Sequence, residues 1–82
     1  MVKIDYKPEF KHFFEKIRDK QLKEKIIKHI QKIIENPEIG KPMRYGRKGT
    51  REVYISPFRL SYIYLSHEQK IVILDLYHKK EQ

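Results

Sequence analysis

The sequence predicts an α+β domain of β-α-α-β-β-β order, in which an antiparallel sheet carries a helical hairpin on one face. Three observations indicate this fold class. A short segment of alternating polarity opens the chain, two apolar stripes at helical spacing follow, and segments rich in β-branched and aromatic residues fill the second half. The chain of 82 residues suffices for one hydrophobic core, so residues 1–82 are expected to form one domain.

The first strand and the first helix are expected within the opening 18 residues. Residues 2–6 alternate between apolar and polar side chains, as a half-buried strand does. Pro8 suits the first position of a helix, and Glu9 places a carboxylate in the turn where the helix dipole favours it. The apolar face of this helix is formed by four residues at helical spacing: Phe10, Phe13, Phe14 and Ile17.

A second and longer helix is predicted to end at Asn36, because Pro37 disfavours a helical conformation in the residue before it. Asp19 and Lys20 leave only a tight connection between the two helices, so they are expected to form an antiparallel hairpin. The apolar stripe of the second helix repeats every three or four residues and is widened by two more isoleucines: Leu22, Ile26, Ile30 and Ile33, with Ile27 and Ile34.

The remainder of the chain predicts a loop followed by three strands. Residues 37–49 contain two prolines and three glycines and are expected to be irregular. Strands are expected at residues 51–55, at residues 58–65, and from residue 70 to Tyr77 or His78. Residues 56–57 and 66–69 separate the three strands.

The charge of the chain favours a polyanionic partner. There are 19 Lys and Arg against 11 Asp and Glu, giving a net charge of +8. Alternatively, many lysines before residue 36 only solvate a helix surface.

The chain has no cysteine, which excludes a disulfide scaffold, a thiolate zinc site and a cysteine nucleophile. No membrane span or secretory signal is predicted, so we expect a cytoplasmic protein.

Basic and aromatic residues alternate through the second half of the chain. Arginine donates two hydrogen bonds to phosphate at once, and aromatic rings stack on unpaired bases, so this mixture favours single-stranded nucleic acid. Alternatively, the aromatic residues are ordinary strand formers of a core. The residues expected to bind RNA are Arg44, Arg47, Lys48, Tyr54 and Tyr62.

The segment at the predicted end of the last strand, His78-Lys79-Lys80, invites a role in proton transfer. Imidazole titrates near neutral pH, and neighbouring cations favour its neutral, basic form. The alternative is a solvated tail. No spacing of His, Asp and Glu indicates a metal site, and no glycine-rich phosphate loop follows a strand, so neither a metal nor a cofactor is expected. RNA cleavage needs neither, because Arg and Lys can stabilise the charge that develops on phosphate.

Three segments together resemble the RelE/ParE superfamily of toxins from toxin–antitoxin systems. They are residues 33–43 (IIENPEIGKPM), residues 49–62 (GTREVYISPFRLSY) and residues 71–80 (IVILDLYHKK). RelE-like toxins cleave messenger RNA on the ribosome without a metal. The resemblance implies that Arg59 binds phosphate and stabilises the transition state, that Lys79 or Lys80 supplies the basic residue after the last strand, and that Arg51 supports them.

Two departures from the RelE-like pattern bear on activity. Tyr54 stands where many members carry a basic residue, and the sequence stops at Gln82, before the position of the catalytic tyrosine of RelE. His78 is then a candidate for the proton-transfer role.

The leading hypothesis is a ribosome-dependent mRNA endonuclease whose partners are the ribosome, mRNA and a cognate antitoxin that covers the basic face. The alternatives are a ParE-like toxin that acts on DNA gyrase without cleaving RNA, and a degenerate domain that only binds its antitoxin or nucleic acid.

Overall fold

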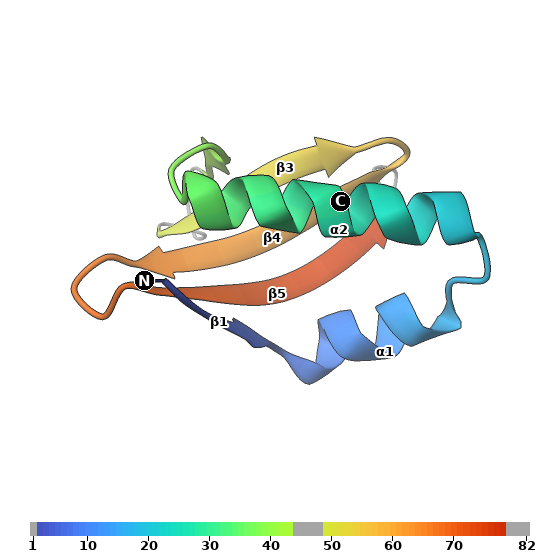
Figure 1. The fold of residues 1–82 in the computed structure, drawn as a ribbon, viewed down its shortest axis with the longest axis horizontal. Helices are drawn as coiled ribbons and strands as arrows, with labels where there is room; N and C mark the ends of the chain where they lie inside the picture. The colour runs from blue at the N-terminus through green and yellow to red at the C-terminus, as the bar shows by residue number, and fades with distance from the viewer. Residues whose placement is uncertain (1, 44–48, 79–82) are drawn as a thin grey trace.

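The structure, a computed structural model, describes residues 2–43 and 49–78. Two helices and five strands follow one another along the chain (Figure 1). Their order is β1 (Lys3–Tyr6), α1 (Pro8–Lys16), α2 (Lys20–Glu35), β2 (Lys41–Pro42), β3 (Thr50–Ile55), β4 (Phe58–Leu65) and β5 (Lys70–His78). The predicted α+β class is therefore confirmed, with the addition of the short strand β2 inside the segment that was expected to be irregular.

The five strands form one sheet in the order β1-β5-β4-β3-β2. The pairs β3–β4 and β4–β5 are antiparallel, as predicted. The unpredicted strand β2 is also antiparallel to β3, whereas β1 runs parallel to β5. The prediction of a wholly antiparallel sheet was wrong at this one edge. Chain-adjacent strands joined by short turns must run antiparallel, but β1 meets β5 from the other end of the sequence and is free of that constraint.

The helices begin and end where the local sequence dictates. Pro8 opens α1, and its missing N–H removes a donor that would otherwise lack a partner there. The Asp19 carboxylate caps α2 by accepting hydrogen bonds from the backbone N–H of Gln21 at 2.9 Å and of Leu22 at 3.3 Å. Asn36 ends α2 just before Pro37. No helix of the described residues is long and apolar enough to span a membrane.

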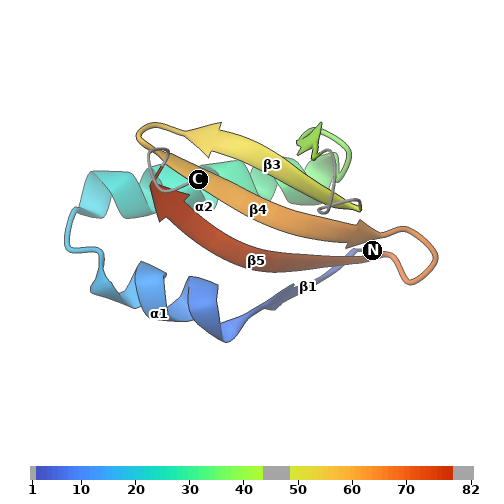
Figure 2. The ribbon, with the colours of Figure 1, turned by 180° about the vertical axis from the view of Figure 1, so that it is seen from behind.

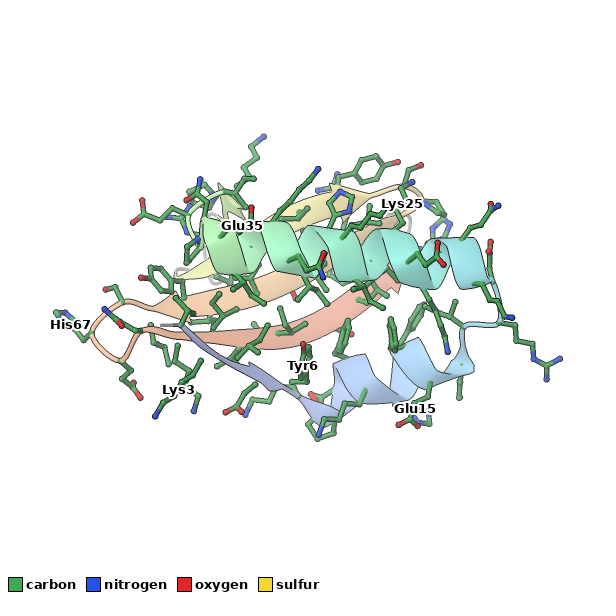
Figure 3. The ribbon with its side chains drawn as sticks, viewed as in Figure 1. Lys3, Tyr6, Glu15, Lys25, Glu35 and His67 are labelled. Atoms are coloured by element: carbon green, nitrogen blue, oxygen red, sulfur yellow. The ribbon has the colours of Figure 1, made fainter. Side chains whose placement is uncertain are left out.

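The core lies between the sheet and the helices. Figures 1 and 2 show α2 crossing one face of the sheet, while α1 lies at the side where β1 ends. Phe13 of α1 packs edge-on against Phe58 of β4, with ring centroids 5.4 Å apart. Lys25 of α2 (Figure 3) donates through Nζ to the carbonyl of Ser56 at 3.3 Å, so α2 is also tied to the β3–β4 turn. The largest fully buried side chains are Ile26, Ile33, Ile55, Leu60, Tyr62, Ile71, Ile73 and Leu76.

The opposite face of the sheet, here called the open face, is covered by no helix of the described residues (Figure 2). Side chains alternate between the two faces along a strand, so the strand register decides which residues reach the open face. Two rows cross it: Tyr54 pairs with Arg59 and Arg59 with Tyr77, while Glu52 pairs with Ser61 and Ser61 with Asp75.

A bulge in β5 decides which residues at the C-terminal end of this strand reach the open face. Ser61 pairs with Asp75 and the next residue, Tyr62, pairs with Ile73, so Leu74 is an extra residue in β5. Beyond the bulge, the alternation of β5 is reversed relative to Ile73. Tyr77 therefore lies on the open face.

Candidate functional site

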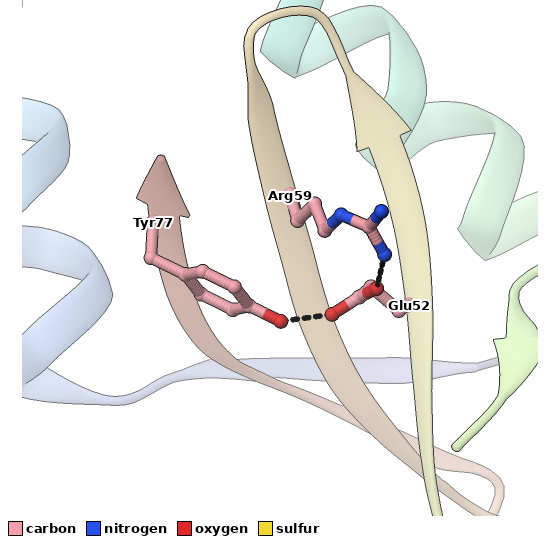
Figure 4. Close-up of polar contacts among 3 residues, drawn as sticks. All are labelled: Glu52, Arg59 and Tyr77. Atoms are coloured by element: carbon pink, nitrogen blue, oxygen red, sulfur yellow. Dashed lines mark hydrogen bonds and ion pairs between the residues drawn. The ribbon is translucent and has the colours of Figure 1, made fainter. Parts of the chain in front are cut away.

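A cluster of Glu52, Arg59 and Tyr77 lies on the open face (Figure 4). Each residue comes from a different one of the three central strands, β3, β4 and β5. Arg59 donates from Nη1 to Glu52 Oε1 at 2.5 Å, and the Tyr77 hydroxyl donates to Glu52 Oε2. One carboxylate thus joins a cation and a phenol across the sheet.

The two charged members of this cluster differ in their exposure. The Glu52 side chain is 6% exposed, whereas that of Arg59 is 29% exposed. The hydrogen bond to Glu52 raises the pKa of Arg59 above its usual value, and desolvation opposes that rise only in part. Glu52 therefore holds a permanently charged guanidinium on the open face. A buried carboxylate is tolerated there because both of its oxygens accept a hydrogen bond.

The Nε–H of Arg59 has no acceptor within the described part of the chain, in contrast to Nη1, which donates to Glu52. This nitrogen is buried and has no hydrogen-bond partner among the described residues. A buried donor without an acceptor costs about 1–3 kcal/mol in general, so such groups are rare in folded proteins. The guanidinium is consequently only partly satisfied by its own protein.

Tyr54 extends the cluster towards the edge of the sheet. Its ring lies 6.0 Å from the Arg59 guanidinium carbon and its side chain is among the exposed large hydrophobic ones, at 52%. The hydroxyl donates to Ser56 Oγ at 3.3 Å. An exposed ring next to an arginine offers a base a stacking surface beside a phosphate contact.

His78 lies on the other face of β5. It pairs with Phe58, and their rings pack edge-on at 5.6 Å. Arg59 and Tyr77 are the next pair along the same two strands and point the opposite way. The structure thus does not bring together His78 and Arg59, which the sequence interpretation had grouped as catalytic.

Arg51 and Tyr62 are also on the helix-covered side, where they hold the segment that follows α2. Arg51 donates from Nη1 to the carbonyls of Glu38 at 3.0 Å and Gly40 at 2.8 Å. The Tyr62 hydroxyl donates to the carbonyl of Pro37 at 2.7 Å and accepts from the N–H of Gly40 at 2.8 Å. Tyr62 is 0% exposed, so its ring has no free face for the base that it was expected to stack on.

Burial also changes the acidity of Tyr62. Desolvation raises the pKa of its phenol, and the hydrogen bond from Gly40 opposes this rise only in part. The hydrogen bonds of Arg51 and Tyr62 to residues 37–40 give both side chains an architectural role in this structure.

The remaining predicted residues lie outside the described residues: Arg44, Arg47, Lys48, Lys79 and Lys80.

Sequence reasoning did not select Glu52 or Tyr77. Glu52 is the only acidic residue between Gly40 and Arg59, and that isolation among basic residues was an available signal. Tyr77 gave no comparable signal, because its face depends on the bulge in β5.

The described residues contain no group of three or more His, Cys, Asp or Glu side chains that could hold a metal ion.

Solved structures of toxins and of toxin–antitoxin complexes share this fold. A chain of the intact E. coli RelBE toxin–antitoxin complex superposes with a TM-score of 0.81 and 15% identity, covering 95% of this chain and 96% of that one. A YoeB/ParE toxin from Agrobacterium tumefaciens gives a TM-score of 0.84 and 18% identity, covering 94% and 98%. The RelBE2 complex of Mycobacterium tuberculosis gives 0.82 and 19%, covering 95% and 98%. At these identities, the likeness establishes the fold.

Sequence comparison establishes the family. No curated protein is a significant match to this sequence. The family model described as the ParE toxin of the type II toxin–antitoxin system parDE, however, matches residues 4–82. The resemblance to RelE/ParE toxins is thereby confirmed. The chain belongs to the ParE toxin family and is the toxin component of a type II toxin–antitoxin system.

Proposed function

We propose that this toxin cleaves messenger RNA on the ribosome without a metal, and that it does so in the cytoplasm. The observation that carries the proposal is the Glu52–Arg59–Tyr77 cluster with Tyr54 beside it. It combines a cation for phosphate, a stacking surface and two proton-transfer groups on the open face.

The reaction that this arrangement supports is attack by a ribose 2′-hydroxyl on the adjacent phosphorus. Glu52 takes the proton of the 2′-hydroxyl, and Arg59 stabilises the charge that gathers on the phosphate oxygens. The bond from phosphorus to the 5′ oxygen breaks, and Tyr77 gives its proton to that oxygen. The products are a 2′,3′-cyclic phosphate and a 5′-hydroxyl. The hydrogen bond between Glu52 and Tyr77 returns the proton to the phenol for the next turnover.

The test is inducible expression in a host without the antitoxin, with primer extension on a reporter transcript. We expect growth arrest and discrete cleavages within translated codons. Arg59→Ala should lower cleavage by about 100-fold or more, because removal of one donor to a developing oxyanion has costs of this size. Arg18→Ala is the matched control, since it removes the same charge from an exposed residue in the connection between α1 and α2. Undiminished cleavage in Arg59→Ala would refute the proposal.

A second candidate is a ParE-like action on DNA gyrase. Two observations favour it: the family model is that of ParE toxins, and the guanidinium of Arg59 already has an anionic partner in Glu52. Growth arrest with intact transcripts and inhibited DNA supercoiling would decide for it. Absence of any arrest would indicate a degenerate toxin that binds only its antitoxin.

The antitoxin is the expected protein partner, because the structural relatives include toxin–antitoxin complexes. We propose that an apolar segment of it uses the groove between α1 and α2. This groove has a volume of about 270 Å³ and is lined by Tyr6, Phe10, Phe14, Ile27 and Ile30 together with Lys11 and Glu15. Ile27 is 45% exposed there, so Ile27→Asp should weaken antitoxin binding without unfolding the toxin. Unchanged binding would place the antitoxin elsewhere.

A further inference from the structure

We propose that Glu52 is an internal ligand which occupies the place of a substrate phosphate on Arg59, and that a phosphodiester binds by exchange with this carboxylate. The inference rests on the phosphate-binding role proposed for Arg59. It adds that the site is self-occupied until nucleic acid arrives. Glu52 then becomes the residue that sets the affinity of the site for anions.

The geometry of the carboxylate supports this assignment. Its two oxygens take different donors, Oε1 from Arg59 and Oε2 from Tyr77. Two oxygens of a phosphodiester can take the same pair of donors, since guanidinium and hydroxyl groups both donate to phosphate. The bond to Arg59 is also charge-assisted, with 2.5 Å between Nη1 and Oε1. The carboxylate therefore holds the donors that a phosphate needs.

The unpartnered nitrogen of Arg59 shows that the internal ligand is an incomplete one. Glu52 bonds Nη1, whereas Nε is buried with no partner among the described residues. A phosphate accepts from arginine in a bidentate manner, through two N–H groups at once. Because Nε is buried in the present side-chain conformation, bidentate binding that uses Nε requires the Arg59 side chain to move. Exchange thus relieves an unsatisfied donor.

Charge makes the two anions mutually exclusive on Arg59. A carboxylate and a phosphate that both contacted one guanidinium would stand within a few ångströms of each other and repel. The partly exposed guanidinium is the part of the pair that a phosphate meets first, since the Glu52 side chain is nearly buried. Binding must therefore break the Glu52–Arg59 contact, and the apparent affinity is reduced by the fraction of molecules in which that contact is closed.

The test is binding of a fluorescent single-stranded deoxyoligonucleotide to the whole protein. This probe has no 2′-hydroxyl and cannot be cleaved by the proposed reaction. Glu52→Gln keeps the shape of the side chain and removes its charge. We expect the dissociation constant of the probe to fall by about tenfold, because the variant loses the closed Glu52–Arg59 contact that competes with binding. Asp75→Asn is the matched control. Asp75 lies in the same row of the open face, one strand beyond Ser61, and its Oδ1 accepts from the N–H of Leu76.

We expect Asp75→Asn to change the affinity less than twofold, because salt screens a charge that makes no contact with Arg59. An equal gain in both variants would mean that only net charge matters, and the proposal would be overturned. No gain in Glu52→Gln, or no binding by either protein, would also overturn it.

A second measurement, by NMR on the unaltered protein, keeps the proposal open to refutation if Glu52→Gln fails to fold. The side-chain carboxyl carbon of Glu52 and the Nε–H of Arg59 should both shift as the probe saturates the site. A shift of Arg59 alone would mean addition in place of exchange and would overturn the proposal. Cleavage of transcripts is a separate readout: its absence refutes the proposed nuclease, while tighter binding by Glu52→Gln would still establish the exchange.

Discussion

Replacement of Tyr62 by phenylalanine removes one hydroxyl and tests how the segment after α2 is held. That hydroxyl is buried and forms two hydrogen bonds, at 2.7 Å to the carbonyl of Pro37 and at 2.8 Å from the N–H of Gly40. Gly40 is itself buried, so its N–H is left without an acceptor. A buried unsatisfied group costs about 1–3 kcal/mol, and with the partly buried Pro37 carbonyl we expect a loss of about 2–3 kcal/mol.

For a domain of this size, each kcal/mol lowers the melting temperature by about 4–8 °C, so the expected decrease is about 10–20 °C. Thermal unfolding followed by circular dichroism measures it, and urea unfolding gives the free energy directly. Tyr64→Phe is the control, because Tyr64 packs against the same core from the same strand and its hydroxyl has no hydrogen-bond partner among the described residues. We expect it to change stability by less than about 0.5 kcal/mol. Equal losses in the two variants would refute the reasoning.

Three further predictions follow from contacts elsewhere. In Gly40→Ala, the new Cβ would lie 2.5 Å from the Tyr62 hydroxyl, so we expect a loss of about 1–3 kcal/mol in urea unfolding. Asp19→Ala removes the cap of α2 and should cost about 1 kcal/mol in the same assay, while Asp19→Asn should cost little. The hydrogen bond from Lys70 lowers the pKa of Asp5 below its unfolded value of 3.8. The pair therefore stabilises the fold at pH values above 3.8, and this stability is lost as the pH falls through the folded pKa. Asp5→Asn should therefore flatten the acid side of a stability–pH curve, and an unchanged curve would refute this.

The alkaline side of that curve tests the burial of Tyr62. Burial raises the pKa of its phenol, so the folded state holds this proton more tightly than the unfolded state does. The stability from this difference is fully present below the unfolded pKa of 10.0 and is lost as the pH rises through the folded pKa. The stability gap between the unaltered protein and Tyr62→Phe should then narrow above about pH 10. A constant gap up to pH 11 would show that the hydroxyl titrates normally.

The elements of the fold were largely predictable from the sequence, because each carries a local signal. Pro8, Asp19 and Pro37 mark helix ends, and the isoleucines of α2 repeat with the helical period. The parallel pairing of β1 with β5 carries no local signal, since it depends on two segments more than 60 residues apart. The strand β2 is only two residues long and lies in a segment rich in Pro and Gly, where no alternation can be detected.

The site was less predictable than the fold, and the bulge in β5 gives the reason. Regular alternation from buried Ile71 and Ile73 would put Tyr77 on the covered face and His78 on the open face. The extra residue Leu74 reverses that assignment, so Tyr77 contacts Glu52 and His78 packs on Phe58. A bulge is set by the packing of neighbouring strands, and residue types alone do not reveal it.

Arg51 and Tyr62 show a second reason. Both have the residue types of a nucleic-acid contact, and both are used inside the protein to hold residues 37–40. Buried polar groups need partners, so a fold that buries backbone carbonyls after a helix must supply donors to them. Arginine and tyrosine serve that purpose as well as they serve RNA, and only the structure separates the two uses.

The central claim is that the open face of this toxin cleaves RNA, and purified protein tests it most directly. The toxin is added to translating ribosomes programmed with a defined transcript, and the 5′ ends of the products are mapped. We expect discrete cuts within codons, products that end in a cyclic phosphate, and their loss in both Arg59→Ala and Glu52→Gln. An intact transcript, in a preparation that inhibits DNA gyrase or arrests growth, would contradict the account.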